Sequence, residues 1–439
     1  MNFPTRKLGL IENLFDIVHD VGGMIDVNVV RIEGLIKPAI LQQALDCLQK
    51  LHPLLQSHIV NLEDGVYFEW EGTTKIPLHV IDKQDDNQWL QVAQEELHQK
   101  FPKDTSPLCR VTLLRSLISN GINEIIVTFH HAITDGTSCM LFVDQLLFYY
   151  QQMTAGEDIP KIATMQLLPP LEKLLDSSLV SKNNIAEKQH NEVISTPEFI
   201  IEEEASPNDR HTCLMTRILS QDMTLRLSDR CKQEKTTVHG ALAAAMLLSV
   251  AKIAFTDLAI SLSCGSNVNL RKYCKPEVAT DNIGCFISIV EEIHTLEKNT
   301  TFWNLARECK SKISHAINIG NPLARILSDD LKYVNRDIIL QISNHHLGRK
   351  NTIEISNRGK FNLADNYGEL KLKELYFATG QHVIGGSFWL GVVTIHDQLF
   401  CTFAHVVPLV SSKTGELLAD SVIANMQKAC MSETFTLEM

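Results

Sequence analysis

The sequence has no excess of basic residues. Lys and Arg together number 40 among 439 residues, against 52 Asp and Glu, so the formal net charge is −12. Nucleic-acid binding depends on Lys and Arg side chains that neutralise phosphates, so this composition argues against a nucleic-acid partner. It also gives no sign of attraction to an anionic membrane surface.

The sequence also lacks C-x-x-C cysteine pairs, zinc-ligand spacing and any long apolar run. The longest apolar run near a helix, residues 241–251, is too short to span a bilayer, and the first residues contain no hydrophobic stretch of a secretory signal. We therefore expect a cytoplasmic protein with no transmembrane segment, no metal and reduced thiols in its core. The eleven cysteines are Cys47, Cys109, Cys139, Cys213, Cys231, Cys264, Cys274, Cys285, Cys309, Cys401 and Cys430.

What the chain does contain is enough apolar material for two cores. Hydrophobic residues make up 44% and charged residues 21%, as in ordinary soluble globular proteins. At roughly 100–200 residues per domain, the length predicts two domains. Residues 172–206 have few large apolar side chains and several turn formers. We therefore expect an N-terminal lobe over 1–175, a crossover linker over 176–207 and a C-terminal lobe over 208–439.

Both halves mix strand and helix patterns, which favours an α/β or α+β layered fold. Two of the strongest patterns are the helix over 238–255 and the hairpin formed by 388–395 and 399–406. The other predicted strands are 24–32, 65–70, 76–81, 108–115, 124–130, 215–219 and 258–263, and the other predicted helices are 39–51, 88–101, 137–153, 221–233, 303–316 and 417–430.

The most informative segment is a buried strand, residues 124–131, that ends in His130 and His131. Successive side chains of a strand point to opposite faces, so one histidine faces a reaction site and the other packs in the scaffold. For the same reason we do not expect His130, His131 and Asp135 to form a metal site. Asp135 and Gly136 supply a turn, and the helix that follows favours nearby negative charge.

This arrangement places a base beside a possible oxyanion stabiliser. Attack of an alcohol or amine on a thioester requires removal of a proton as the new bond forms. Imidazole suits that task at neutral pH and can contribute roughly 10²–10⁴-fold. The sequence has no G-x-S-x-G elbow, and this chemistry requires no covalent enzyme intermediate.

The segment from His130 to Gly136, H-H-x-x-x-D-G, resembles the signature of the thioester-dependent acyltransferase superfamily. That superfamily includes chloramphenicol acetyltransferase, peptide-synthetase condensation domains, polyketide-associated acyltransferases and fungal alcohol acetyltransferases. Residues 31–55, 236–245, 267–288 and 355–359 also resemble its segments, so the resemblance covers most of the chain. The chain has no D-F-G-W-G segment, and it has Phe286-Ile287-Ser288 where condensation domains often have Phe-Val-Asn. The whole looks closest to the polyketide-associated or alcohol acyltransferase branch.

The resemblance implies a fold, two chloramphenicol-acetyltransferase-like lobes in a V-shaped pseudo-dimer. Donor and acceptor would enter from opposite faces and meet at His131, the general base. His130, Asp135, Gly136 and Arg271 would be structural, with Asp135 paired to Arg271. Ser356 and Asn357 would lie near the substrate tunnel. We expect a monomer.

The function that this implies is transfer of an acyl group from a CoA or carrier-protein thioester to a hydroxyl acceptor, with no bound cofactor. One alternative is a free-standing condensation enzyme that forms an amide or ester from carrier-bound thioesters. Another is an inactive member that only binds a carrier or lipid. The basic residues Arg349, Lys350, Arg358 and Lys360 are interpreted as a solvated face, or as contacts to a donor phosphate or carrier protein.

Overall fold

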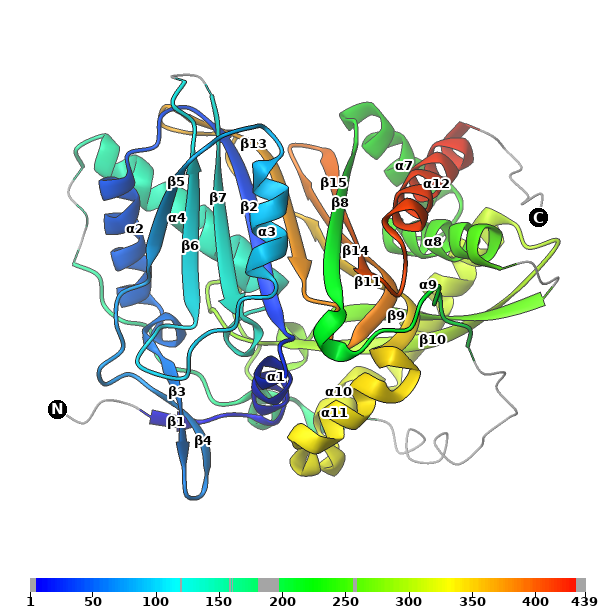
Figure 1. Cartoon of the computed structure of the whole chain (residues 1–439), viewed down its shortest axis with the longest axis horizontal. Helices are drawn as coiled ribbons and strands as arrows, with labels where there is room; N and C mark the ends of the chain where they lie inside the picture. The colour runs from blue at the N-terminus through cyan, green and yellow to red at the C-terminus, as the bar shows by residue number, and fades with distance from the viewer. Residues whose placement is uncertain are drawn as a thin grey trace.

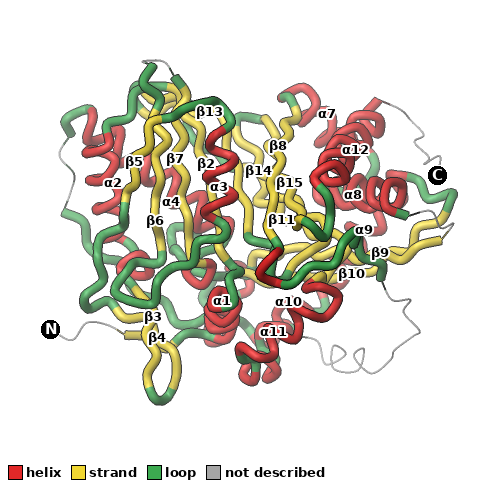
Figure 2. Tube along the Cα trace, in the orientation of Figure 1, coloured by secondary structure: helices red, strands yellow, loops and turns green. Residues whose placement is uncertain are grey.

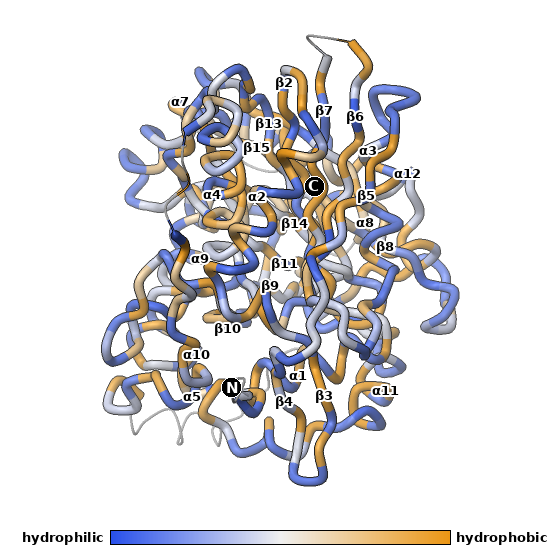
Figure 3. The backbone as a smooth tube through the Cα atoms, turned by 90° about the vertical axis from the view of Figure 1, so that its left-hand side faces the viewer, coloured by the Kyte–Doolittle hydropathy of each residue, from blue (hydrophilic) through white to orange (hydrophobic). Residues whose placement is uncertain are grey.

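A computed structural model describes residues 5–118, 121–157, 159, 161–180, 197–255 and 259–431. Two large mixed sheets stand side by side, one in each lobe, and helices cover their outer faces (Figures 1 and 2). Hydrophobic residues gather in the strands, whereas the peripheral loops are largely hydrophilic (Figure 3). The predicted mixed α/β class is therefore confirmed.

The first sheet contains the strand that carries the histidine pair. Its strands are antiparallel except for β5 and β6, and its apolar residues form one core with α2 and α4. In spatial order the strands are β12 (Asn366–Tyr367), β13 (Leu370–Thr379), β2 (Ile25–Glu33), β7 (Ile122–His130), β6 (Cys109–Arg115) and β5 (Leu78–Asp82).

The second sheet lies in the C-terminal half. Its strand β11 runs parallel to both of its neighbours, and the other pairs are antiparallel. In spatial order the strands are β10 (Ile287–Glu297), β9 (Ala259–Asn269), β11 (Arg349–Lys360), β14 (Gly385–Ile395), β15 (Gln398–Val407) and β8 (His211–Leu219). A third, small sheet joins β1 (Thr5–Lys7), β4 (Gly65–Glu69) and β3 (His58–Leu62).

The N-terminal and C-terminal halves of the sequence do not form two separate sheets. Strands β12 and β13 come from the C-terminal half, yet β13 pairs with β2 of the first sheet over most of its length. The expected C-terminal lobe over 208–439 therefore gives up residues 366–379 to the N-terminal sheet. Local sequence patterns could not predict this exchange, because the sequence of a strand does not specify which strand it pairs with. In the expected linker, residues 181–196 lie outside the described part of the chain.

The helices form the outer layers of both lobes. Helix α8 is apolar on all sides over residues 240–251, and this stretch is buried in the second core, packed against α9 and α12. The helices are α1 (Leu10–Asp20), α2 (Pro38–Leu51), α3 (Gln88–Glu96), α4 (Gly136–Thr154), α5 (Leu171–Leu174), α7 (Gln221–Gln233), α8 (Val238–Ala254), α9 (Phe302–Asn318), α10 (Asn321–Ile326), α11 (Arg336–Asn344) and α12 (Ser412–Met431). Among the described helices, none alone has the length and hydropathy to cross a membrane; α7 and α8 meet that criterion only as a pair bent by 99°.

Helices α1, α10 and α11 lie where the two lobes meet, at the lower edge in Figure 1. Helix α1 was not expected from the sequence, although Leu10, Ile11, Leu14, Phe15 and Val18 follow helical spacing. The predicted helix over 88–101 ends early, since α3 stops at Glu96.

Candidate active site

The predicted turn lies at the end of β7, where the two lobes face each other. Strand β7 ends at His130, a short 3-10 turn covers His131–Ile133, and α4 begins at Gly136. Asp135 is the N-cap of α4, because its Oδ1 accepts the backbone N–H of Ser138 at 2.9 Å. That N–H is therefore already used, and it is not free to stabilise an oxyanion.

His131 has the hydrogen bonding that a general base needs. Its Nδ1 lies 2.9 Å from the backbone oxygen of Thr134. A carbonyl oxygen can only accept, so Nδ1 carries the proton and Nε2 keeps a free lone pair. The ring packs against Phe15 of α1 with 4.8 Å between ring centroids. His131 is partly exposed, and it lines a cavity between the lobes.

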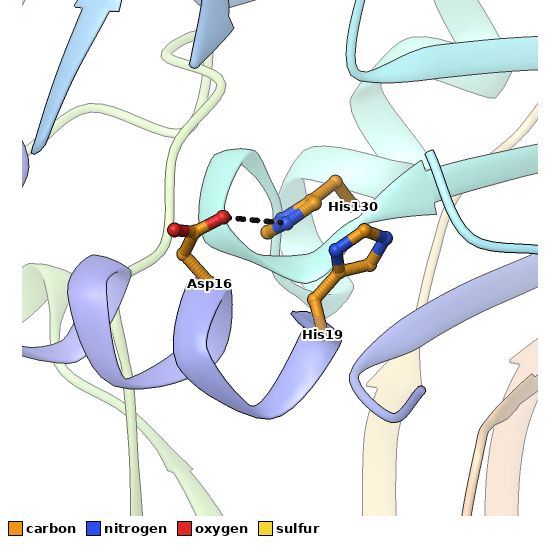
Figure 4. A group of neighbouring side chains, drawn as sticks. All are labelled: Asp16, His19 and His130. Atoms are coloured by element: carbon orange, nitrogen blue, oxygen red, sulfur yellow. Dashed lines mark ion pairs between the residues drawn. The ribbon is translucent and has the colours of Figure 1, made fainter. Parts of the chain in front are cut away.

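His130 points away from that cavity, in the direction opposite to its neighbour. It is buried beside α1, where its ring centroid lies 4.2 Å from that of His19 (Figure 4). Its Nε2 faces Asp16 Oδ1 at 3.5 Å, and its Nδ1 accepts the N–H of Ala132. Burial lowers the pKa of His130, so the imidazole is neutral.

Asp16, His19 and His130 form the one cluster in the described chain whose side-chain atoms lie close enough to suggest a metal site. One possible ligand atom from each of these three side chains lies within 4.8 Å of the other two. However, His19 Nε2 accepts the N–H of Phe101 at 2.9 Å, and His130 Nδ1 is likewise an acceptor. The other ring nitrogen of each histidine, His19 Nδ1 and His130 Nε2, therefore carries the proton. The cluster presents two N–H donors to one carboxylate, which does not fit a cation that needs lone pairs.

Asp135 and Arg271 are joined across the two lobes. Arg271 follows β9 and donates to Asp135 Oδ2 at 2.6 Å, with both side chains buried. The same carboxylate oxygen accepts the N–H of Phe286, and the guanidinium also donates to Ser138 Oγ. Burial alone would raise the pKa of Asp135, but the charge and hydrogen bond of Arg271 hold it below its ordinary value.

Gly136 lies against a second buried arginine, Arg358 of β11. A Cβ on Gly136 would stand 2.9 Å from Arg358 Cγ, so this position requires a residue without a side chain. Arg358 pairs with Asp26 of β2 at 3.2 Å, and its guanidinium stacks over Phe377 at 3.5 Å from the ring centroid. A second ion pair, between Arg358 and Asp26, therefore joins the two lobes next to Gly136 of the turn.

The expectation of a solvated basic face is wrong for two of its four residues. Arg358 is buried in the pair with Asp26. Arg349 is buried and donates to the backbone oxygens of Gly386 and Gln381, which leave it no freedom to reach a phosphate. Lys350 and Lys360 are exposed, as expected. The two arginines were misread because a charged residue near the end of a strand gives no local sign of a distant partner.

Ser356 and Asn357 lie on β11, but the structure does not bring them to the cavity that holds His131. Neither is among the described side chains that line it. Asn357 Oδ1 instead accepts the N–H of Gly359 at 2.9 Å, where the register of β11 against β14 shifts. The asparagine thus stabilises a local irregularity of the strand.

The cavity at His131 has a volume of about 290 Å³ and lies between α1, α11 and the second sheet. A second cavity of about 430 Å³, lined by residues that include Arg271 and Lys272, shares Asn267 of β9 with the first. Sequence reasoning missed most of the lining, because the helices α1, α10 and α11 and the strands β10 and β11 were not predicted. The helical spacing over residues 10–18 was the available signal for α1.

Comparison with known proteins fits this geometry. A family model described as "Condensation domain" matches residues 26–337, which is well over half of the chain. The chain belongs to the condensation-domain family. The similar curated relatives are far larger proteins. The chain is 23% identical over 316 residues to cyclosporin synthetase of Tolypocladium inflatum, and this match covers 68% of the chain but 2% of the relative. The chain spans only 2–3% of the length of the curated relatives it matches.

Solved structures of condensation-family and acyltransferase proteins share the whole fold. The epimerization domain from the third module of tyrocidine synthetase B has a TM-score of 0.74 at 15% identity, over 98% of this chain and 97% of that one. Trichothecene 15-O-acetyltransferase from Fusarium sporotrichioides has 0.73 at 11%, over 97% and 95%. Polyketide synthase associated protein 5 from Mycobacterium tuberculosis has 0.64 at 16%, over 97% and 100%. The predicted superfamily and two-lobed fold are confirmed, and this membership supports a transferase.

Proposed function

We propose that the chain transfers an acyl group from a CoA or carrier-protein thioester to a hydroxyl acceptor and so forms an ester. The observation that carries the proposal is the tautomer of His131, whose Nδ1 proton is bound to Thr134 and whose Nε2 lone pair is free at the cavity between the lobes. A base in this state can act at neutral pH without an activating partner.

The proposed reaction uses only groups of this chain and the two substrates. Nε2 of His131 takes the proton of the acceptor hydroxyl as its oxygen attacks the thioester carbonyl. The tetrahedral intermediate then collapses, the carbon–sulfur bond breaks, and the imidazolium returns the proton to the thiolate that leaves. The thioester is a co-substrate, and the proposal includes no bound cofactor.

In this proposal Asp135, Arg271 and His130 do no chemistry. The buried pair of Asp135 and Arg271 holds the turn between the lobes, and His130 anchors the end of β7 to α1. Both halves of the chain contribute to one site, so we expect a functional monomer. Light scattering of the purified chain tests that expectation.

The direct test replaces His131 with alanine and measures transfer from an acyl-CoA to a panel of alcohols. We expect kcat/KM to fall by about 10²–10⁴-fold because the proton acceptor is lost. His315 is an exposed histidine of α9, so His315→Ala is the matched control and should retain full activity. Turnover by His131→Ala at the rate of the control would rule out the base assignment.

A second candidate is condensation of carrier-bound thioesters with an amine, which would form an amide. The family model and the peptide-synthetase relatives favour it. Side-by-side assays with CoA-bound and carrier-bound donors, and with alcohol and amine acceptors, separate the two reactions. A member that only binds would exchange acyl groups with none of these donors, and the free lone pair of His131 argues against it.

A further inference from the structure

Three side-chain amides line the first of the two cavities, and they differ in their hydrogen bonds. Asn351 donates from Nδ2 to Glu291 at 3.3 Å, and Gln381 donates from Nε2 to the backbone oxygen of Thr379 at 3.0 Å. The side chain of Asn267, on β9, has no hydrogen-bond partner within the described ranges, and this residue is only partly buried. The two N–H groups of its amide are therefore available to a bound substrate.

The register of the second sheet directs Asn267 toward this cavity. On β10, Ile287, Ile289 and Glu291 occupy alternate positions, and all three line the cavity that holds His131. Asn267 pairs with Ile289 in the antiparallel ladder of β9 and β10. Residues paired across a sheet point to the same face, so the amide of Asn267 lies on the cavity side of the sheet.

Asn267 also stands at a point where two strands separate. Strand β9 pairs with β11 only over residues 264–266, whereas its pairing with β10 continues to Asn269. Asn267 is thus the first residue of β9 beyond its last pair with β11. It lines the second cavity as well as the first, so it lies where the two cavities adjoin.

This position matters because the proposed reaction brings two substrates together. His131 lines the first cavity and not the second, so an acceptor whose proton it takes lies in the first. A thioester that meets this acceptor from the second cavity has its carbonyl group beside Asn267. The carbonyl oxygen becomes negative during the attack, and the N–H of Ser138 is already bonded to Asp135. A neutral amide donor fixed beside that oxygen stabilises the developing charge.

We propose that Asn267 is a catalytic residue that donates a hydrogen bond from Nδ2 to the oxyanion. This inference rests on the proposed function. As the acceptor oxygen bonds to the carbonyl carbon, its proton passes to Nε2 of His131, and an electron pair of the carbonyl bond moves to the oxygen that Asn267 binds. When this pair re-forms the carbonyl, the carbon–sulfur bond breaks and the leaving thiolate takes the proton back from His131.

The kinetic test measures kcat and KM of Asn267→Ala with octanoyl-CoA and the alcohol or amine that the unchanged chain uses best. We expect kcat to fall by about 10²–10³-fold with little change in KM, because the hydrogen bond strengthens only in the transition state. Asn267→Asp has the same shape without the N–H groups, so it should lose at least as much. Asn61→Ala, at an exposed asparagine of β3, is the control and should keep full activity.

Thermal melts separate this role from a structural one. The amide of Asn267 bonds to nothing in the described chain, so Asn267→Ala and Asn267→Asp should melt at the temperature of the unchanged protein. Full kcat in either variant would overturn the assignment. A lowered melting temperature that accounts for the lost activity would do so as well, and so would a change confined to KM.

A second measurement does not depend on turnover. Octanoyl-CoA with an isotope label at its carbonyl carbon is bound to His131→Ala, and infrared spectroscopy records the carbonyl stretching band. A hydrogen bond from Asn267 lowers that frequency, so the band should move to higher frequency when Asn267→Ala is added. An unmoved band in a chain that transfers acyl groups defeats only the role of Asn267. A moved band in a chain that transfers none supports the carbonyl contact and defeats only the proposed function.

Discussion

The lobes meet along two seams of opposite chemistry. At the active-site seam, buried ion pairs join Asp135 to Arg271 and Asp26 to Arg358. At the histidine seam, formed by His98, His211 and His382 together with Thr212, the rings of His98 and His382 contact each other in a tilted arrangement with 4.1 Å between their centroids, and burial lowers the pKa of both. His382 donates from Nε2 to the oxygen of Gly22, and its Nδ1 lies 3.1 Å from Thr212 Oγ1.

The two seams differ in the change that destabilises each of them. A buried ion pair is costly to break because the remaining partner keeps an uncompensated charge. The contact between the neutral imidazoles of His98 and His382 loses little when one of them is replaced by another polar side chain, but it opposes protonation. We therefore expect the active-site seam to be sensitive to mutation, and the histidine seam to be sensitive to acid.

The largest effect is expected for Asp135→Ala. It leaves Arg271 buried without its carboxylate, and it removes the N-cap of α4, so the free energy of unfolding should fall by about 3–5 kcal/mol. Denaturant unfolding measures this loss, and activity should fall with it. Asp229→Ala is the control, because Asp229 pairs with Lys232 on the surface and should matter by less than about 1 kcal/mol. Loss of activity at unchanged stability would contradict the structural role of Asp135.

Arg358→Met should cost less, about 1–3 kcal/mol of unfolding free energy. Asp26 loses its cation but keeps hydrogen bonds from Asn28 and Thr379, and methionine can still pack on Phe377. Arg358→Lys should give an intermediate value, since it restores the charge without the planar stack. If Arg358→Met is as stable as the unchanged chain in thermal melts, the second ion pair does not hold this seam.

The smallest effect is a dependence on pH at the histidine seam. Burial, followed by the charges of neighbouring histidines, lowers the pKa of His98 and lowers that of His382 to about 3. Below about pH 6.5 the unfolded chain takes up protons that these folded histidines do not. Their contribution to stability is therefore complete above that pH and is lost as pH falls, by at most about 1.4 kcal/mol per pH unit for each histidine.

Thermal melts between about pH 7.5 and about pH 5 measure this slope. His382→Gln should flatten the pH dependence while changing the melting temperature little at neutral pH. His315→Ala, at an exposed site, should leave the slope unchanged. An equal slope in all three proteins would show that other groups govern the response to acid.

Local sequence patterns predicted the part of the site around His131. Alternation along residues 124–131 predicted that His130 and His131 diverge, and the structure points them in opposite directions. The Asp-Gly pair predicted a turn and helix start at 135–136, where the structure has the N-cap of α4. The pairing of Asp135 with Arg271 was implied only by the family resemblance, and the structure brings the two side chains together. The catalytic role of His131 stays a prediction.

The distant part of the site could not be read from the sequence. Arg358 and Asp26 are separated by more than three hundred residues, and no local pattern links them. Glu291 and Glu354 gave no local sign that they lie close together, because only the pairing of β10 and β11 with β9 brings both beside Gly265. Helix α1 was missed, although its spacing was regular, and with it the contact between Phe15 and His131.

Because β13 belongs to the first sheet, that sheet can be completed only after residues 370–379 have been synthesised. Until residues 370–379 leave the ribosome, β2 has an open edge on one side, although β7 is already available to pair on the other. An open, apolar strand edge invites pairing with other chains. The N-terminal lobe therefore cannot finish folding during its own synthesis, and a nascent chain that stops before residue 370 should need a chaperone to stay soluble.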